Sequence, residues 1–107
     1  MIHKQLELIH ADSLLKRACG LLFKAKLKSN EIIWLRSCNA IHTVGMRYSI
    51  SLFYLNSHHK VIDLIQEIKP FSFSANPRAE SVVETLAYTE LTAEDIESTI
   101  ELFLGSR

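Results

Sequence analysis

Residues 38 to 55 read Cys-Asn-Ala-Ile-His-Thr-Val-Gly-Met-Arg-Tyr-Ser-Ile-Ser-Leu-Phe-Tyr-Leu, a polar loop around one glycine that runs straight into an apolar strand. We expect the strand at Ile50 to Leu55, because a run that is apolar on both faces near its end is typical of a central strand. The loop before it carries a thiol, an imidazole, a hydroxyl and a guanidinium. Polar loop residues on a stiff apolar support are frequent site residues. This stretch therefore indicates where a site lies without specifying a reaction.

Short apolar or alternating runs on both sides of this stretch predict further strands. They lie at residues 5–9, 31–36, 60–65, 71–74 and 81–87, and residues 41–46 form a short strand or loop broken at Gly45. Residues 56–59 are expected to be the turn of a hairpin.

Two short helices complete the prediction. Residues 14–22 carry an amphipathic helical stripe, and Thr92 with Asp95 resembles a capping box. We expect the second helix to run from Thr92 to about Glu97 and to be followed by a strand to Leu104. The fold class is then α+β and mainly β, with a curved antiparallel-rich sheet or a small open barrel and two short helices.

Length and composition predict one domain, residues 1–107, because no linker-like stretch divides the chain. There is no signal peptide or membrane-spanning run, so we expect a cytoplasmic protein without membrane insertion. Cys19 and Cys38 are expected to be free thiols. The residues before Lys60 hold 8 Lys/Arg and 3 Asp/Glu, and the rest hold 4 and 9. If the two halves interleave in one sheet these charges mix, so no nucleic-acid partner is predicted.

His42 and Arg47 are the first candidates for a ligand site. Gly45 lets the backbone turn sharply between them, and an arginine fork with a histidine donor suits an anion. The remaining predicted binding residues are Thr43 and Met46 in the same loop, with Trp34, Arg36 and Cys38 nearby. The structural alternative is that His42 bonds to a backbone carbonyl and Arg47 pairs with an acidic side chain of the C-terminal half.

Other chemistries have weaker support. Cys38 and His42 could form a thiol nucleophile and its base, although a half-buried structural cysteine is the alternative. Metal ligands show no recognised spacing, so neither a metal nor a cofactor is predicted. An aromatic group could line a pocket or belong to the core. Its members are Trp34, Phe53, Tyr54, Phe71 and Phe73.

The segment from Leu35 to Arg47 resembles the Pro-Cys-x-x-Ile/Val-His-Thr-x-Gly-Met-Arg motif of the bacterial and archaeal domain of unknown function 192. Residues 17–22 and 79–86 are similar to two further motifs of that family, so the resemblance covers almost the whole chain. It implies a compact, mainly β domain and no established activity. Some members carry export signals or are encoded beside pilus or secretion genes, which implies an accessory role at the cell envelope as one alternative.

Three departures from the family pattern concern a shared ligand more than a shared fold. Ser51 stands where the family usually has an aspartate, Ala87-Tyr88 replaces Ala-Gly, and Glu97-Ser98 replaces a Gly-Asp turn. Because the loop gathers hydrogen-bond donors without a carboxylate partner for acid/base work, we expect a non-catalytic binding module for a small anionic ligand or an acidic peptide. The alternatives are a thiol-dependent hydrolase or transferase using Cys38 and His42, and an accessory protein of a pilus or secretion system that docks through residues 24–28.

Overall fold

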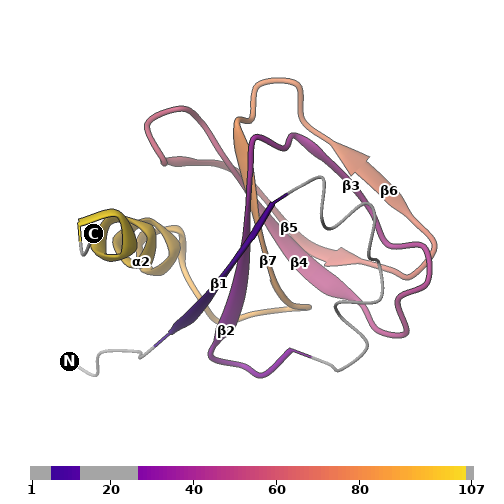
Figure 1. Ribbon diagram of the computed structural model, residues 1–107. Coiled ribbons are helices and arrows are strands. Elements are labelled where there is room, and N and C mark those ends of the chain that lie inside the picture. The colour runs from indigo at the N-terminus through magenta and orange to yellow at the C-terminus, as the bar shows by residue number, and fades with distance from the viewer. Residues whose placement is uncertain (1–5, 13–26, 106–107) are drawn as a thin grey trace.

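The computed structural model describes residues 6–12 and 27–105, with side chains omitted at 10–12, and this part of the chain is mainly β (Figure 1). The elements in chain order are β1 (Glu7–Asp12), β2 (Glu31–Arg36), β3 (Ala40–His42), β4 (Ile50–Leu55), β5 (Val61–Ile68), β6 (Phe73–Ala75), β7 (Ser81–Leu86) and the helix α2 (Ala93–Gly105). The strands predicted before residue 90 and the β4–β5 hairpin are confirmed, with shifts of a few residues at their ends.

Five strands form one mixed sheet in the order β1-β2-β7-β4-β5. Only β1 and β2 pair in parallel, and the other neighbours are antiparallel. The sheet is therefore antiparallel-rich, as predicted. Within the described residues its edge strands β1 and β5 do not pair, so the sheet is not a closed barrel.

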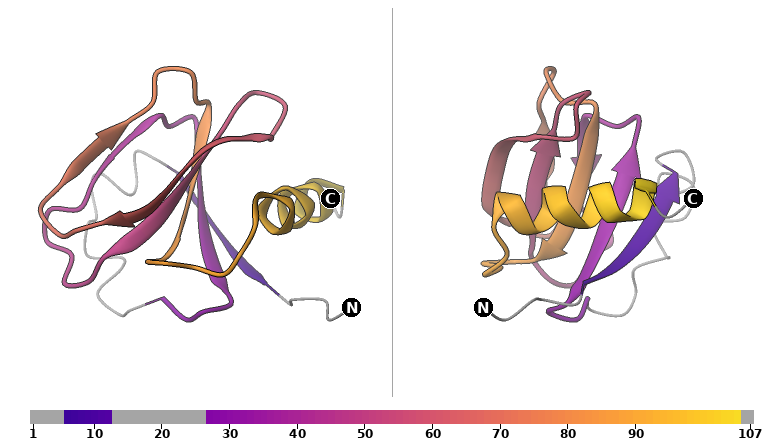
Figure 2. Two further views of the ribbon diagram at one scale, coloured as in Figure 1. Left: turned by 180° about the vertical axis from the view of Figure 1, so that it is seen from behind. Right: turned by 90° about the vertical axis from the view of Figure 1, so that its left-hand side faces the viewer.

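A separate two-stranded sheet, which we call the β3–β6 ribbon, pairs β3 with β6. Both views in Figures 1 and 2 place α2 on one side of the five-stranded sheet and the β3–β6 ribbon on the other. The five-stranded sheet is thus the middle layer of three, and each of its faces is covered by a different element.

The sheet buries apolar side chains on both of its faces, as the run at residues 50–55 predicts. All six residues of β4 are buried. Ile33, Leu35 and Leu52 belong to the core on the ribbon side, whereas Trp34 and Phe53 belong to the core on the helix side. This alternation follows from the two-residue period of a strand, which sends successive side chains to opposite faces.

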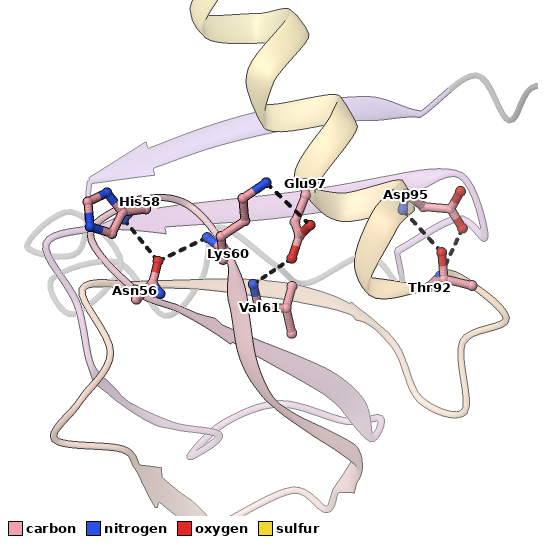
Figure 3. A network of polar contacts seen from close by, with 7 residues as sticks. All are labelled: Asn56, His58, Lys60, Val61, Thr92, Asp95 and Glu97. Carbon is pink, nitrogen blue, oxygen red and sulfur yellow. Dashed lines mark hydrogen bonds and ion pairs between the residues drawn. The ribbon is translucent and has the colours of Figure 1, made fainter.

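The predicted strand at residues 98–104 is wrong, because α2 continues through this segment to Gly105. The predicted capping box is present: Thr92 Oγ1 accepts a hydrogen bond from Asp95 N at 3.1 Å, and Asp95 Oδ2 accepts one from Thr92 N at 2.8 Å (Figure 3). Beyond the cap, Ile96 and Ile100 are both fully buried against the sheet. Their spacing of four residues matches one helix face, and their burial outweighs the alternating pattern of Ile100, Leu102 and Leu104.

One carboxylate joins α2 to the neighbouring hairpin. Glu97 Oε2 accepts a hydrogen bond from Val61 N at 2.8 Å, and Glu97 Oε1 lies 3.9 Å from Lys60 Nζ (Figure 3). The turn itself is closed by Asn56 Oδ1, which accepts from the backbone N–H groups of His58 and Lys60. Glu97 thus fixes the position of the hairpin relative to the helix, and Asn56 fixes the shape of the turn.

Several predictions fall on residues outside the described part of the chain. They are the short helix at 14–22, the thiol of Cys19 and most of the lysine edge at 24–28, of which only Leu27 and Lys28 are described. The described part contains no helix with both the length and the apolar character needed to cross a membrane.

Candidate functional site

Thr43 holds the loop after β3 against the segment that leads into β6. It is fully buried, and its Oγ1 donates a hydrogen bond to Lys69 O at 2.7 Å and accepts one from Ser72 N at 2.8 Å. Its backbone N–H donates to Ser72 O, and its carbonyl accepts from Phe71 N and Met46 N. Thr43, predicted as a ligand contact, is thus engaged with the protein backbone. Its role is to position the loops around it.

His42 and Arg47 are both exposed at the ends of this Thr43-centred loop. His42 Nδ1 accepts a hydrogen bond from Val44 N at 3.3 Å, so one ring nitrogen is used locally. The structural alternative predicted that the His42 ring donates a hydrogen bond to a backbone carbonyl. In the structure, its Nδ1 atom instead accepts a hydrogen bond from a backbone N–H group. No described residue forms an ion pair with Arg47, so the predicted acidic partner from the C-terminal half is not found among them.

Large apolar side chains lie exposed around these two residues. Val44 is 56% exposed, Phe71 74% and Phe73 72%. Phe73 is the register partner of His42, and Phe71 N bonds to Thr43 O, which brings the two segments together. We call this area the ribbon surface, and it comprises His42, Val44, Arg47, Lys69, Phe71 and Phe73. Sequence reasoning had grouped both phenylalanines with a pocket wall or the core. In the alternating Phe-Ser-Phe-Ser segment at residues 71–74, the phenylalanines are exposed and Ser74 is buried.

The ribbon surface carries positive charge without acidic residues nearby in the sequence. No Asp or Glu occurs between Glu31 and Asp63 or between Glu67 and Glu80. These two acid-free stretches contain the whole β3–β6 ribbon and both of its loops, together with Arg47 and Lys69. A peptide or ion approaching this surface therefore meets cations whose charge is not balanced by the adjoining loops.

A buried hydrogen bond ties the β3–β6 ribbon to the main sheet. Tyr54 Oη of β4 and Ser74 Oγ of β6 lie 2.5 Å apart. Burial raises the pKa of the Tyr54 hydroxyl, and the hydrogen bond with Ser74 partly opposes this effect. Tyr54 therefore ties β6 to the main sheet, and Thr43 ties the loop after β3 to the segment that leads into β6.

Met46 and Cys38 belong to the core between the β3–β6 ribbon and the main sheet. Met46 is buried in the core on the ribbon side, and Cys38 packs against that core as a free thiol. The thiol donates a hydrogen bond to Ala40 O at 3.1 Å, whereas His42 Nδ1 faces Val44 N. A Cys38–His42 pair would need a hydrogen bond between thiol and ring. Because both groups bond to the backbone instead, the geometry gives the thiol-dependent alternative no support.

A shallow cavity of about 320 Å³ adjoins Cys38. It is lined by Ser37, Cys38, Asn39, Ala79 and Glu80. Among the residues that the structure describes, no three His, Cys, Asp or Glu side chains lie together in a way that could hold a metal ion.

Trp34 and Arg36 lie away from the other predicted site residues. The Arg36 guanidinium carbon is 4.8 Å from the centroid of the Trp34 ring, and Trp34 belongs to the core on the helix side. Cys38 and Met46 belong to the ribbon side of the same sheet. The seven predicted residues therefore do not form one cluster, because the period of two along β2 sends Trp34 and Leu35 to opposite faces.

Ser51, which replaces the aspartate usual in the resembling family, also serves the sheet. It is buried in β4, and its hydroxyl donates to Gln66 O of β5 at 2.7 Å. The hydroxyl of Ser51 thus contacts a neighbouring strand, and the ribbon surface does not include it.

Taken together, these features define a small β-rich domain in which a five-stranded sheet carries a helix on one face and the two-stranded β3–β6 ribbon on the other. The chain matches the model of DUF192, the domain of unknown function 192, described as an uncharacterized ACR, over residues 2–100. The protein belongs to this family, as the sequence motifs predict.

Two solved structures share the fold. One is a protein of unknown function from Novosphingobium aromaticivorans DSM 12444, with a TM-score of 0.65 and 12% identity, covering 77% of this chain and 64% of that one. The other is a candidate transcription regulator from Sinorhizobium meliloti 1021, with a TM-score of 0.66 and 12% identity, covering 77% of this chain and 69% of that one. This chain thus spans about two thirds of each. No curated protein matches it.

Proposed function

We propose that this protein is a non-catalytic binding module whose ribbon surface takes up an acidic, partly apolar peptide segment of a partner protein. The observation that carries the proposal is the exposure of Val44, Phe71 and Phe73 beside Arg47 and Lys69. Contiguous exposed apolar side chains on a small domain are typical of interaction sites.

The backbone conformation at Phe71 supports a binding role. Phe71 has φ of +59°, a left-handed conformation that is unfavourable for a bulky side chain by about 1–2 kcal/mol. The hydrogen bond from Phe71 N to Thr43 O accompanies this conformation, in which the ring is 74% exposed. The exposed ring of Phe71 contributes little burial to the described part of the fold, so packing does not explain the strained backbone. This combination of backbone strain and exposure favours a role in contacts with another molecule.

The ribbon also offers backbone groups to a peptide. Within the described residues β3 and β6 each have one strand neighbour, so each leaves one edge open. An extended peptide can add to such an edge through main-chain hydrogen bonds, while its alternate side chains contact the exposed rings. Acidic residues in that peptide would meet Arg47 and Lys69, where no local carboxylate competes.

The test uses labelled ten-residue peptides in which Glu alternates with Leu or Phe, measured by fluorescence anisotropy. We expect saturable binding, weakened about tenfold or more, roughly 1.4 kcal/mol, by Phe71→Ser with Phe73→Ser, and also weakened by Arg47→Gln with Lys69→Gln. Leu102→Ser, on the exposed side of α2, is the matched apolar control and is expected to bind like the wild type. Peptides with Gln in place of Glu should bind more weakly.

Three outcomes would contradict the proposal. They are equal binding by the Phe71/Phe73 variant, equal binding of the Gln peptides, and binding of anionic vesicles or duplex DNA in preference to every acidic peptide. Circular dichroism of each variant checks that lost binding does not reflect lost folding.

A further inference from the structure

A second group of polar side chains gathers around Trp34, on the face of the sheet opposite the ribbon surface. The Arg36 guanidinium lies over the Trp34 ring at 4.8 Å, and the His59 ring meets the same indole edge-on, with centroids 5.5 Å apart. Arg36 and His59 are half-buried, so both reach solvent, whereas Trp34 is fully buried. The indole thus forms the floor beneath two nitrogen-bearing groups.

Sheet register adds Ser81 to this group. Ser81 of β7 pairs with Arg36 of β2 on one side and with Leu55 of β4 on the other. Paired residues direct their side chains to the same face of a sheet, and Leu55 belongs to the helix-side core with Trp34. His59 lies in the hairpin that follows Leu55, where φ of +62° turns the chain. Three elements far apart in sequence therefore supply one cluster.

Ser81 supplies the observation that points to a ligand. Its side chain is only 4% exposed, yet in the described part of the chain Oγ has no hydrogen-bond partner. Burying a hydroxyl without a partner is unfavourable, and such groups are rare in folded proteins. Arg36 likewise forms no ion pair with any described side chain, and its guanidinium contacts the indole. Its register neighbour on β1 is Asp12, of which the structure describes the backbone alone. The cluster offers hydrogen-bond donors without a described acceptor.

We propose that Arg36, His59 and Ser81 bind a phosphate group, either inorganic phosphate or the phosphate of a small monoester. Arginine can donate two parallel hydrogen bonds to phosphate oxygens, and a hydroxyl and an imidazole N–H can reach others. Donors that converge from β2, β7 and the hairpin suit a tetrahedral anion better than a planar carboxylate. This site is separate from the ribbon surface, so either proposal can fail alone.

Trp34 is the chain's only tryptophan, which makes its fluorescence a direct reporter of the site. The experiment titrates the protein with inorganic phosphate at constant ionic strength and follows Trp34 emission. We expect a saturable change that chloride does not produce. A monoester without an aromatic ring, such as glycerol phosphate, is titrated in parallel. Whichever compound binds more tightly shows whether the site prefers the free ion or an esterified phosphate.

Variants locate the effect. Arg36→Gln is expected to raise the phosphate Kd about tenfold or more, and Ser81→Ala to raise it several-fold while the protein stays folded, because it removes only a buried hydroxyl. Lys28→Gln is the matched charge control, since Lys28 is exposed just before the opposite end of β2. It should leave the Kd unchanged.

The proposal is overturned if no saturable change occurs with either phosphate compound, or if Arg36→Gln and Lys28→Gln weaken binding equally. Equal affinity for acetate would overturn the assignment to phosphate. An unchanged Kd in Ser81→Ala would remove Ser81 from the site and with it the observation on which the proposal rests.

Discussion

At the scale of one residue, Thr43 shows how a polar side chain in a motif can be predicted as a ligand contact and yet have a structural role. A buried hydroxyl that both donates and accepts joins two loops that have no regular ladder between them. Sequence reasoning placed Thr43 in a site because of its polar neighbours. It could not show that the acceptor, Lys69 O, lies 26 residues further along the chain.

Replacing Thr43 with valine keeps the shape of the side chain and removes the three hydrogen bonds of the hydroxyl. We expect a loss of about 1–3 kcal/mol in the free energy of unfolding, because Lys69 O and Ser72 N lose their hydroxyl partner beside a buried apolar group. Urea denaturation measures this value. Thr43→Ser, which keeps the hydroxyl, is the control and should lose less. A valine variant as stable as the wild type would show that the hydroxyl does not hold the two loops.

Tyr54 gives the chain a predictable response to alkaline pH. Because burial raises its pKa in the folded state, the folded protein holds the phenolic proton more tightly than the unfolded chain does. The stabilisation is complete below the ordinary tyrosine pKa of about 10. It is lost as the pH rises from there through the folded-state value.

The measurement is the urea midpoint between pH 8 and pH 11. We expect the wild type to lose stability above about pH 10, and Tyr54→Phe to lose less over the same interval despite a lower stability at pH 8. Tyr48 is also raised by burial, so Tyr48→Phe serves as a comparison and part of the slope should remain in each single variant. Identical slopes in the wild type and Tyr54→Phe would contradict this account.

At the scale of elements, the sequence predicted the strands and the start of the helix from periodic or local patterns. It did not predict features that depend on which surface a segment packs against. The period of two located the strands, and Thr92 with Asp95 located the start of α2. Residues 98–104 satisfy both periods, so only the sheet face that receives Ile100 decides between helix and strand. The candidate site was divided for a similar reason, because a loop sequence does not specify toward which face of a sheet it folds.

A strand and a helix at residues 98–104 predict different effects for two substitutions, one at Ile100 and one at Leu102. In a strand, Ile100 and Leu102 would share a face, whereas in α2 Ile100 is fully buried and Leu102 is 74% exposed. We therefore expect Ile100→Ala to lower the free energy of unfolding by about 2–5 kcal/mol through the cavity that it leaves. Leu102→Ala should change it by less than about 0.5 kcal/mol. Similar losses from both variants in thermal or urea denaturation would contradict the helix.

At the scale of the whole molecule, the sheet order shows how the oppositely charged halves of the chain contribute strands to one sheet. Strands β1, β2 and β4 come from the basic half, and β5 and β7 come from the acidic half. Because β7 lies between β2 and β4, the halves interleave, which is the condition under which we expected the charges to mix. The ribbon surface departs from this mixing, since β3 and β6 and their loops lie within the two acid-free stretches.

The layered arrangement predicts that the β3–β6 ribbon opens more readily than the sheet beneath it. β4 and β7 each have two strand neighbours and are buried almost throughout, whereas β3 and β6 have one each and present exposed residues. Segments with few buried apolar contacts open at lower free energy. In native-state hydrogen exchange we therefore expect the amides of β4 and β7 to approach the protection set by global unfolding, and those of the ribbon to exchange at least about tenfold faster.

Thr43→Val then separates the two layers in the same measurement. If the hydroxyl of Thr43 holds the ribbon locally, the variant lowers protection in β3 and β6 by a larger factor than in β4 and β7, although all four share the global loss. A uniform loss would mean that ribbon and sheet open as one unit. An acidic peptide that bound the ribbon surface would act in the opposite direction and slow exchange there first, because a ligand stabilises only the states that can bind it.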